Sequence, residues 1–179
     1  MKVIMLLIVG ILNGFSLTKD EILKIAKMPH NRENLVKELQ IYGEGREYEV
    51  EVTIMSPGKE PVTSPKVVVT EKTVEGKYIV TFIPMGEEGE MIMVVEYDKK
   101  ENCYFKWILP PLEDAEVFRS VGTADKKSRS IAWSTIDSGA GLNGVTLEKH
   151  GDREVTWSEV HTIDGKVVQR VDGKAIKLK

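Results

Sequence analysis

Two charged residues fall on strand faces that should otherwise be apolar. A two-residue period over Glu154–His161 puts Glu159 on the face of Trp157, and the same period over Glu116–Val121 puts Arg119 on the face of two valines. An isolated charge in a protein interior is costly, so an inward-facing Arg119 would need a partner, and Glu159 is a candidate. The pair would then fix the polar head of a mostly apolar ligand. Two alternatives stay open: a satisfied internal ion pair, or strands turned so that both charges face water.

The other polar residues do not predict catalysis. His30, His150 and His161 lack the spacing of a metal site, so we expect no metal. The sequence has no nucleophile elbow, phosphate loop or dinucleotide fingerprint, so we predict no catalytic residue and no cofactor. The single cysteine, Cys103, excludes an intrachain disulfide, and its apolar neighbours favour a small buried side chain over a reactive thiol.

The elements that position these residues are strands with short connections. Over Tyr48–Ile54, apolar residues alternate with polar ones, as in a strand with one wet face. Further strand-like runs follow about every 10–12 residues, separated by hairpin residues such as Glu75-Gly76, Asp164-Gly165 and Asp172-Gly173. These runs are Val67–Val74, Tyr78–Ile83, Met91–Tyr97, Cys103–Leu109, Glu116–Val121, Ser130–Ile136, Val145–Lys149, Glu154–His161, Val167–Val171 and Ala175–Leu178.

Short connections make sequential strands neighbours, so the fold should be mainly β and antiparallel. About ten strands in one sheet would expose long edges unless the sheet closed on itself. We therefore predict a closed β-barrel, with a two-sheet sandwich as the alternative. The glycine-rich stretch Asp137–Gly144 joins two strands and leads into no helix that could bind a phosphate, so we interpret it as a flexible loop at the barrel mouth.

A hollow barrel would present its aromatic and long apolar side chains to a ligand. The residues that we associate with ligand binding are Tyr48, Phe82, Met93, Phe105, Trp107, Trp133 and Trp157, together with the charged Arg119 and Glu159. The three tryptophans are equally explained as core or barrel-wall residues, which need no function.

One or two short helices should precede the barrel, within residues 18–42. Thr18 and Glu21 fit a capping box, and Pro29 ends this first helix. A second helix should begin at Asn31 and stop near Gly43. Helices this short need to pack on something larger.

Residues 1–16 have the pattern of a secretory signal peptide. A positive charge at Lys2 precedes the apolar run Val3–Leu12, and the small residues Gly14 and Ser16 follow. An apolar run of about ten residues is too short to cross a bilayer, so we expect no stable membrane span. Cleavage after Ser16 would leave residues 17–179 as a single domain that is secreted or periplasmic. The alternative is a buried N-terminal strand or helix.

The charge pattern argues against one class of partner. The net charge is −3, and acidic and basic residues are interspersed along the chain. A nucleic-acid binder needs a concentrated basic face, because the release of counterions from phosphates drives its binding. We therefore expect no nucleic-acid partner.

Three motifs resemble a family of uncharacterised bacterial lipocalin-like proteins. They are the proline-rich stretch Met55–Ser64, the strand start Val74–Tyr78, and Glu96-Tyr97-Asp98 with the later Tyr104 and Trp107. The likeness covers roughly residues 31–179 and implies a calycin-type closed barrel with no established activity. The chain departs from the family where Gly43-Glu44-Gly45 replaces Gly-x-Trp, and where Glu96 stands in place of a glycine. The first departure removes the tryptophan that would close one barrel end.

Three functions follow from these observations. The first is an exported, non-enzymatic barrel that binds a small hydrophobic or amphipathic molecule in its lumen. The alternative is an interaction or structural module whose barrel is filled with side chains and which docks on a protein partner, of a kind that the sequence does not identify. An enzyme is the least favoured, because no nucleophile–base or carboxylate pair can be placed.

Overall fold

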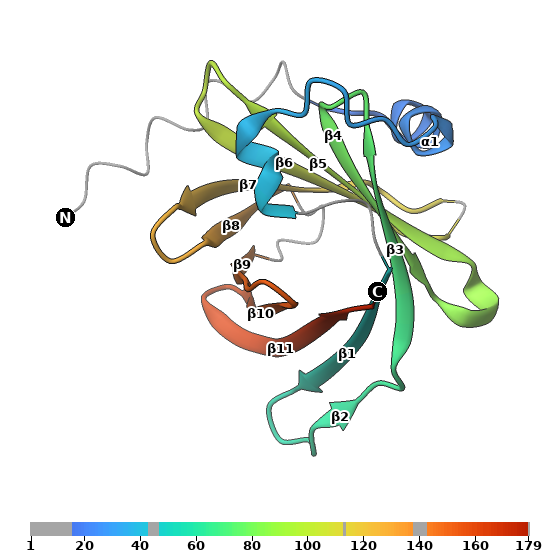
Figure 1. The fold of residues 1–179 in the computed structure, drawn as a ribbon. Helices are drawn as coiled ribbons and strands as arrows, with labels where there is room; N and C mark the ends of the chain where they lie inside the picture. Colours follow the sequence, from blue (N-terminus) through green and yellow to red (C-terminus); the bar gives the residue numbers. More distant parts are fainter. Residues whose placement is uncertain (1–15, 43–46, 113, 138–142, 179) are drawn as a thin grey trace.

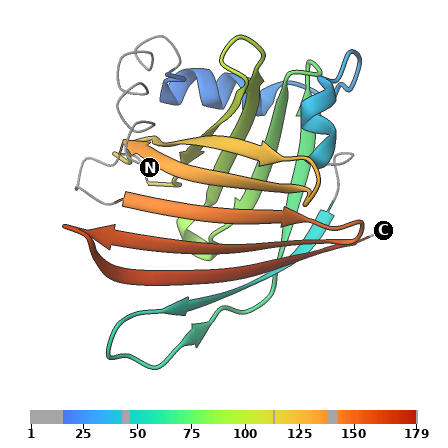
Figure 2. The same ribbon diagram turned by 90° about the vertical axis from the view of Figure 1, so that its left-hand side faces the viewer.

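The strands pair in chain order around a closed ring (Figures 1 and 2). The computed structural model describes residues 16–42, 47–112, 114–137 and 143–178. Its strands are β1 (Glu47–Met55), β2 (Val62–Thr63), β3 (Val67–Val74), β4 (Tyr78–Pro84), β5 (Glu90–Asp98), β6 (Cys103–Leu109), β7 (Phe118–Asp125), β8 (Ser130–Asp137), β9 (Asn143–His150), β10 (Glu154–Ile163) and β11 (Lys166–Lys177).

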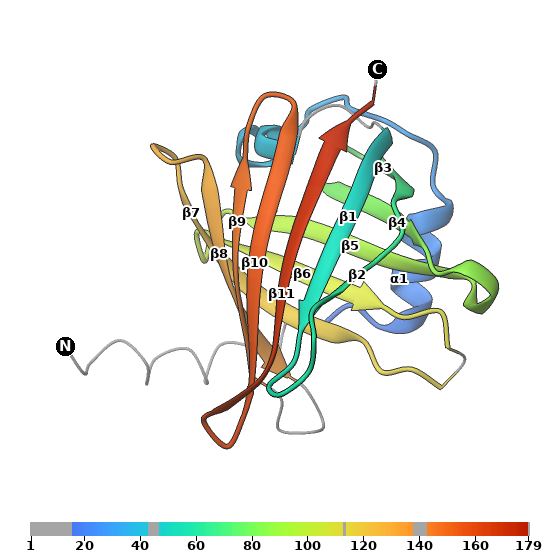
Figure 3. The ribbon, with the colours of Figure 1, turned by 90° about the horizontal axis from the view of Figure 1, so that it is seen from below.

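The pairing of β1 with β11 closes the sheet. From β3 to β11 each strand pairs with the next, and β1 lies between β3 and β11, from Tyr48 opposite Lys177 to Met55 opposite Arg170. Figure 3 shows β9, β10, β11 and β1 side by side in this wall. The short strand β2 adds to β1 outside the ring. The prediction of a closed antiparallel barrel of about ten strands is confirmed, and the sandwich alternative is excluded.

One predicted hairpin is wrong. Asp172-Gly173 does not separate two strands but lies inside β11. Gly173 pairs with Trp157 of β10, and a Cβ atom on this glycine would overlap the indole ring. A glycine is therefore needed here so that the Trp157 ring can lie against the β11 backbone. In the sequence alone, such a glycine within a strand looks the same as a glycine in a turn.

Helix α1 (Lys19–Lys27) packs on the outside of the barrel, against β4, β5 and β6. Its start is the predicted capping box, because the Thr18 amide donates to Glu21 Oε2 at 2.8 Å and the Glu21 amide donates to Thr18 Oγ1 at 3.3 Å. At its other end, Lys72 Nζ of β3 donates to the carbonyls of Ala26 and Met28, each at 2.7 Å. These bonds satisfy carbonyl groups at the end of the helix that have no hydrogen-bond partner within it.

The second helix is shorter than expected. Only the 3₁₀ turn η2 (Lys37–Tyr42) forms, and the segment before it pairs with the β3–β4 hairpin instead. The Asn31 amide donates to the Thr73 carbonyl, and the Val36 amide to that of Gly76. Asn34 has a φ of 60°, outside the right-handed helical region. These backbone amides therefore form hydrogen bonds with the β3–β4 hairpin and not within a second helix.

The turn η2 covers one end of the barrel, which we call the capped end. Tyr104 Oη donates to the Glu38 carbonyl at 3.0 Å, and Tyr48 Oη donates to the Tyr42 carbonyl at 3.3 Å. Both tyrosines lie on the inner face of the sheet, so η2 closes the lumen there. At the opposite end, which we call the far end, lie the hairpin with the 3₁₀ turn η3 (Gly86–Glu88) and the β10–β11 turn.

Among the described residues, none of the helices has the length and apolar character needed to cross a bilayer. The predicted signal peptide, except its last residue Ser16, and most of the glycine-rich loop lie outside the described residues.

Candidate functional site

A charged cluster occupies the inner wall of the barrel. Lys106 of β6, Trp133 of β8, and Glu148 and His150 of β9 are each less than a tenth exposed. Trp133 Nε1 donates to Glu148 Oε2 at 3.2 Å, and His150 Nε2 lies 2.5 Å from Glu148 Oε1. Lys106 Nζ lies over the Trp133 ring, 4.3 Å from its centroid. Both oxygens of the Glu148 carboxylate are therefore engaged by neighbours.

Strand β9 builds this cluster by turning Thr146, Glu148 and His150 inward. Gly144, Thr146, Glu148 and His150 are buried, whereas the intervening apolar residues are exposed. A Cβ atom at Gly144 would lie 2.6 Å from Thr135 Oγ1, so a larger residue there would force the Thr135 side chain to move. The bonds from Trp133 and His150 compensate part of the cost of burying Glu148.

The environment shifts the proton affinities of this cluster. Burial lowers the pKa of Lys106, against the opposing charges of Glu148 and Glu159. Burial alone would raise the pKa of Glu148, but the hydrogen bond from His150 and the charge of Lys106 outweigh it, so the pKa is lowered. The pKa of Tyr42, which covers the cluster from η2, is raised by burial and by the charge of Glu148. The carboxylate is thus favoured and the ammonium is disfavoured.

Lys106 is the least satisfied member of the cluster. Its described partners are the Trp133 ring and the more distant charges of Glu148 and Glu159. Within the described part of the chain, no acceptor lies within hydrogen-bond reach of its ammonium. An ammonium has three donors to satisfy, so this group can accept a further partner from the lumen.

Other buried polar atoms of the inner face also have no partner. Within the described residues, such atoms include Thr73 Oγ1, Thr81 Oγ1, His150 Nδ1 and His161 Nδ1. Buried polar groups in folded proteins almost always bond to protein or to ordered water. These atoms can form hydrogen bonds with water or with polar groups that enter the lumen.

The inner wall changes character toward the far end. There the side chains are only half-buried, although they face into the barrel: Val52, Ile83, Met93, Ile108, Ser120, Thr135, Trp157, Glu159 and His161. Glu159 Oε1 lies 3.1 Å from His161 Nε2, and their side chains are 28% and 18% exposed. Solvent therefore reaches the inner wall from this end, and Lys106 lies where the packed half meets the accessible half.

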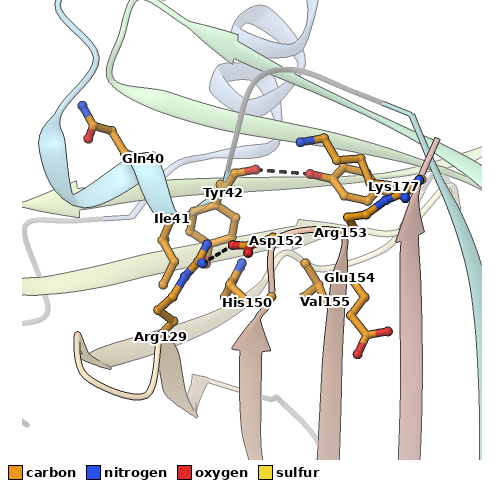
Figure 4. Close-up of a pocket in the computed structure, with 12 residues that line it drawn as sticks. Gln40, Ile41, Tyr42, Arg129, His150, Asp152, Arg153, Glu154, Val155 and Lys177 are labelled. Carbon is orange, nitrogen blue, oxygen red and sulfur yellow. Dashed lines mark hydrogen bonds and ion pairs between the residues drawn. The ribbon is translucent and has the colours of Figure 1, made fainter. Parts of the chain in front are cut away.

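A small pocket lies at the capped end (Figure 4). It has a volume of ≈ 120 Å³, and η2 and the β7–β8 and β9–β10 turns line it. Arg129 Nη1 pairs with Asp152 Oδ1 at 2.5 Å at its rim, while Tyr42 and His150, with ring centroids 4.9 Å apart, connect it to the buried cluster. A pocket of this volume suits a few waters or a small ion. Within the described residues, no three His, Cys, Asp or Glu side chains converge as metal ligands would.

The structure divides the predicted ligand-binding residues between the two faces of the sheet. Five of them lie on the inner face: Tyr48, Met93, Trp133, Trp157 and Glu159. The other four, Phe82, Phe105, Trp107 and Arg119, lie on the outer face.

Helix α1 is the physical reason for this division. Because α1 covers the outer face, Phe105 and Trp107 are buried there without facing the lumen. Arg119 pairs with Trp107 across β6 and β7 and shares its face, so the structure does not bring Arg119 and Glu159 together. The positive charge near Glu159 is that of Lys106.

Sequence reasoning missed Lys106, Glu148 and His150. Lys106 did leave a signal, because it is the one charged residue in the apolar run Cys103–Leu109. Glu148 and His150 left none, since they alternate with Val145 and Leu147, which a two-residue pattern assigns to the interior.

Known proteins give little guidance on this site. No protein-family model matches the chain, and no curated protein matches it. Among solved structures, the crystal structure of the ywiB protein from Bacillus subtilis is similar over 76% of this chain and 93% of that chain, at 10% identity and a TM-score of 0.36. A likeness this weak carries no argument, so the barrel rests on its own strand pairing, and membership of the lipocalin-like family stays a prediction.

Proposed function

We propose that the barrel binds a small amphipathic molecule in the far half of its lumen, with the polar head toward Lys106. The observation that carries this proposal is the buried Lys106 ammonium, for which the described residues supply no acceptor, at the boundary of the solvent-accessible inner wall. A buried charge is expensive, and a hydrophobic residue would stabilise the fold more. A ligand that satisfies this group explains its presence.

The far end supports entry of an apolar tail. The large hydrophobic residues exposed at this end are Ile54, Val62, Met85, Leu112, Phe118, Ile163 and Val167. Exposed apolar side chains gathered at one place commonly mark a binding or entry surface. Met93 and Trp157, half-buried on the inner wall, would contact the tail further in.

A second candidate is docking on a protein partner. Val145 and Leu147 are 58% and 43% exposed on the outer face of β9, and the capped half of the lumen is filled by side chains. Both observations favour a filled barrel that acts through its outer wall.

Ligand binding is testable with the fluorescent probe N-phenyl-1-naphthylamine. The wild-type chain should bind it, and Met93→Trp should abolish binding by filling the lumen, while the matched outer substitution Val145→Trp should leave binding unchanged. A thermal melt of each variant controls for folding. Absence of probe binding, or equal binding by both variants, would contradict the lumen site and favour docking through the outer wall.

We also propose that the protein acts after export, in the periplasm or outside the cell. The support is the pattern of residues 1–16 together with the capping box at Thr18, which begins α1 directly after the expected cleavage point. Intact-mass measurement of the protein expressed from the full chain should show loss of residues 1–16. A mass that retains them would refute the proposal.

A further inference from the structure

Charges of both signs face the lumen, with carboxylates in excess. Lys106 contributes one positive charge, and the nearby Glu148 and Glu159 contribute two negative charges that act on it. The buried Glu71, opposite Thr81 on the same face, is a third carboxylate and acts on Tyr42. Glu148 is engaged by Trp133 and His150, and Glu71 has a partner of its own, so Lys106 and Glu159 are the groups that an entering head would meet. His161, beside Glu159, adds the buried Nδ1 atom that lacks a partner among the described residues.

Each of these groups restricts the head in a different way. The Lys106 ammonium can only donate hydrogen bonds, so the head must accept. The Glu159 carboxylate can only accept, so the head must also donate. A carboxylate head could not donate and would add a negative charge beside Glu148 and Glu159. An ammonium head could not accept and would add a positive charge beside Lys106.

We infer that the ligand carries a neutral head that both donates and accepts hydrogen bonds, such as a primary alcohol or a carboxamide, selected by Lys106 and Glu159 together. This inference rests on the proposed lumen site and specifies its ligand. A cationic donor and an anionic acceptor on one wall make a site specific in two ways: they bind a head that accepts and donates hydrogen bonds, and they repel heads of either charge.

The test is displacement of N-phenyl-1-naphthylamine at pH 7 by four compounds with the same ten-carbon chain. Decan-1-ol and decanamide should displace the probe at concentrations about tenfold or more below those of decanoate and decylamine. Equal displacement by decanoate or decylamine would overturn the neutral head and leave the lumen site standing. Displacement by none of the four would refute both, since a lumen that holds the probe should admit at least one of these tails.

Two variants test the residues assigned to selection. Lys106→Met removes the like charge, so decylamine should gain at least about tenfold and match decan-1-ol. Glu159→Gln removes a negative charge, so decanoate should gain instead. The control Lys174→Met removes an exposed lysine that pairs with Glu154 on the outer face, and it should leave the order of the four compounds unchanged. Glu159 is 28% exposed, so Glu159→Gln should fold even if Lys106→Met does not, and an unchanged order in Glu159→Gln would overturn the assignment.

Discussion

The outer and inner faces of the same strands differ in the residues that they bury. On the outer face of β4–β6, beneath α1, Val80, Val94 and Trp107 are at most 1% exposed and belong to an apolar core cluster with the helix. On the inner face, Ile79 and Val95 are as deeply buried, but the polar residues Lys106 and Thr81 are buried there as well. In a typical small barrel the interior is the core. Here the main apolar core of this wall lies outside the ring.

This arrangement would separate the residues that stabilise the fold from those of the proposed binding site. Helix α1 buries Ile22, Ile25 and Ala26 against the outer face and supplies apolar burial that the lumen would otherwise have to supply. The inner wall can then carry charges and half-exposed side chains without loss of the fold. The comparison predicts that substitutions of equal size will have unequal effects on the two faces.

Truncation of a tryptophan should show the largest difference. Trp107→Ala should lower the free energy of unfolding by about 3–5 kcal/mol, because the closed outer core cannot refill the space. Trp157→Ala should cost roughly half of that or less, since the side chain is only half-buried and solvent can enter. Urea denaturation followed by circular dichroism measures both. Equal losses would break the comparison, because they would make the inner wall as dry and closed as the outer one.

Removal of the charge at Glu148 should show the next largest effect, and this effect depends on pH. Glu148→Gln should lower the free energy of unfolding at pH 7 by about 1.5–3 kcal/mol, because it weakens the bonds from Trp133 and His150 and removes the charge opposite Lys106. The control Glu154→Gln affects an exposed ion pair with Lys174 and should cost at most about 1 kcal/mol.

The pH dependence follows from the direction of the Glu148 shift. The folded protein holds the pKa of Glu148 below its ordinary value of 4.5, so the unfolded chain binds this proton more tightly. The carboxylate therefore stabilises the fold fully above that ordinary value, and its contribution disappears as the pH falls through the lowered pKa. Wild type and Glu148→Gln should converge in stability in acid. A difference that persists or grows there would contradict the buried ionised carboxylate.

The order and closure of the strands could be predicted from the sequence, because they depend on local features. Turn residues and a two-residue period locate nearly every strand, and short connections force neighbours to pair. Gly173 is the exception, because it is a glycine to leave space for the Trp157 ring of the next strand and not to form a turn. Such a contact between strands is invisible to a local pattern.

The orientation of the strands could not be predicted in the same way. A strand such as β4, with Ile79 buried on the inner face and Val80 on the outer, is apolar on both sides, so alternation does not say which side faces the lumen. On β9 the pattern points the wrong way, because Val145 and Leu147 are exposed and Glu148 is buried. The position of α1 and the partners of Glu148 decide these orientations. Both depend on contacts between segments that are distant in the sequence, which a local pattern does not contain.

The reactivity of Cys103 tests the apolar character of the outer core without a change in stability. It is half-buried at the edge of that core, where burial, with the nearby charges of Asp98 and Glu101, raises the pKa of its thiol from an ordinary 9.0 to about 11. Because the thiolate is the reactive form, the folded protein should react with 5,5′-dithiobis(2-nitrobenzoate) at pH 8 about a hundredfold more slowly than the protein in urea. The control is a cysteine at exposed Lys99 in a Cys103→Ala background, which should react at the same rate in both conditions. A Cys103 that reacts as fast when folded would show that water reaches this edge of the outer core, and the contrast between the two faces would then hold only beneath the centre of α1.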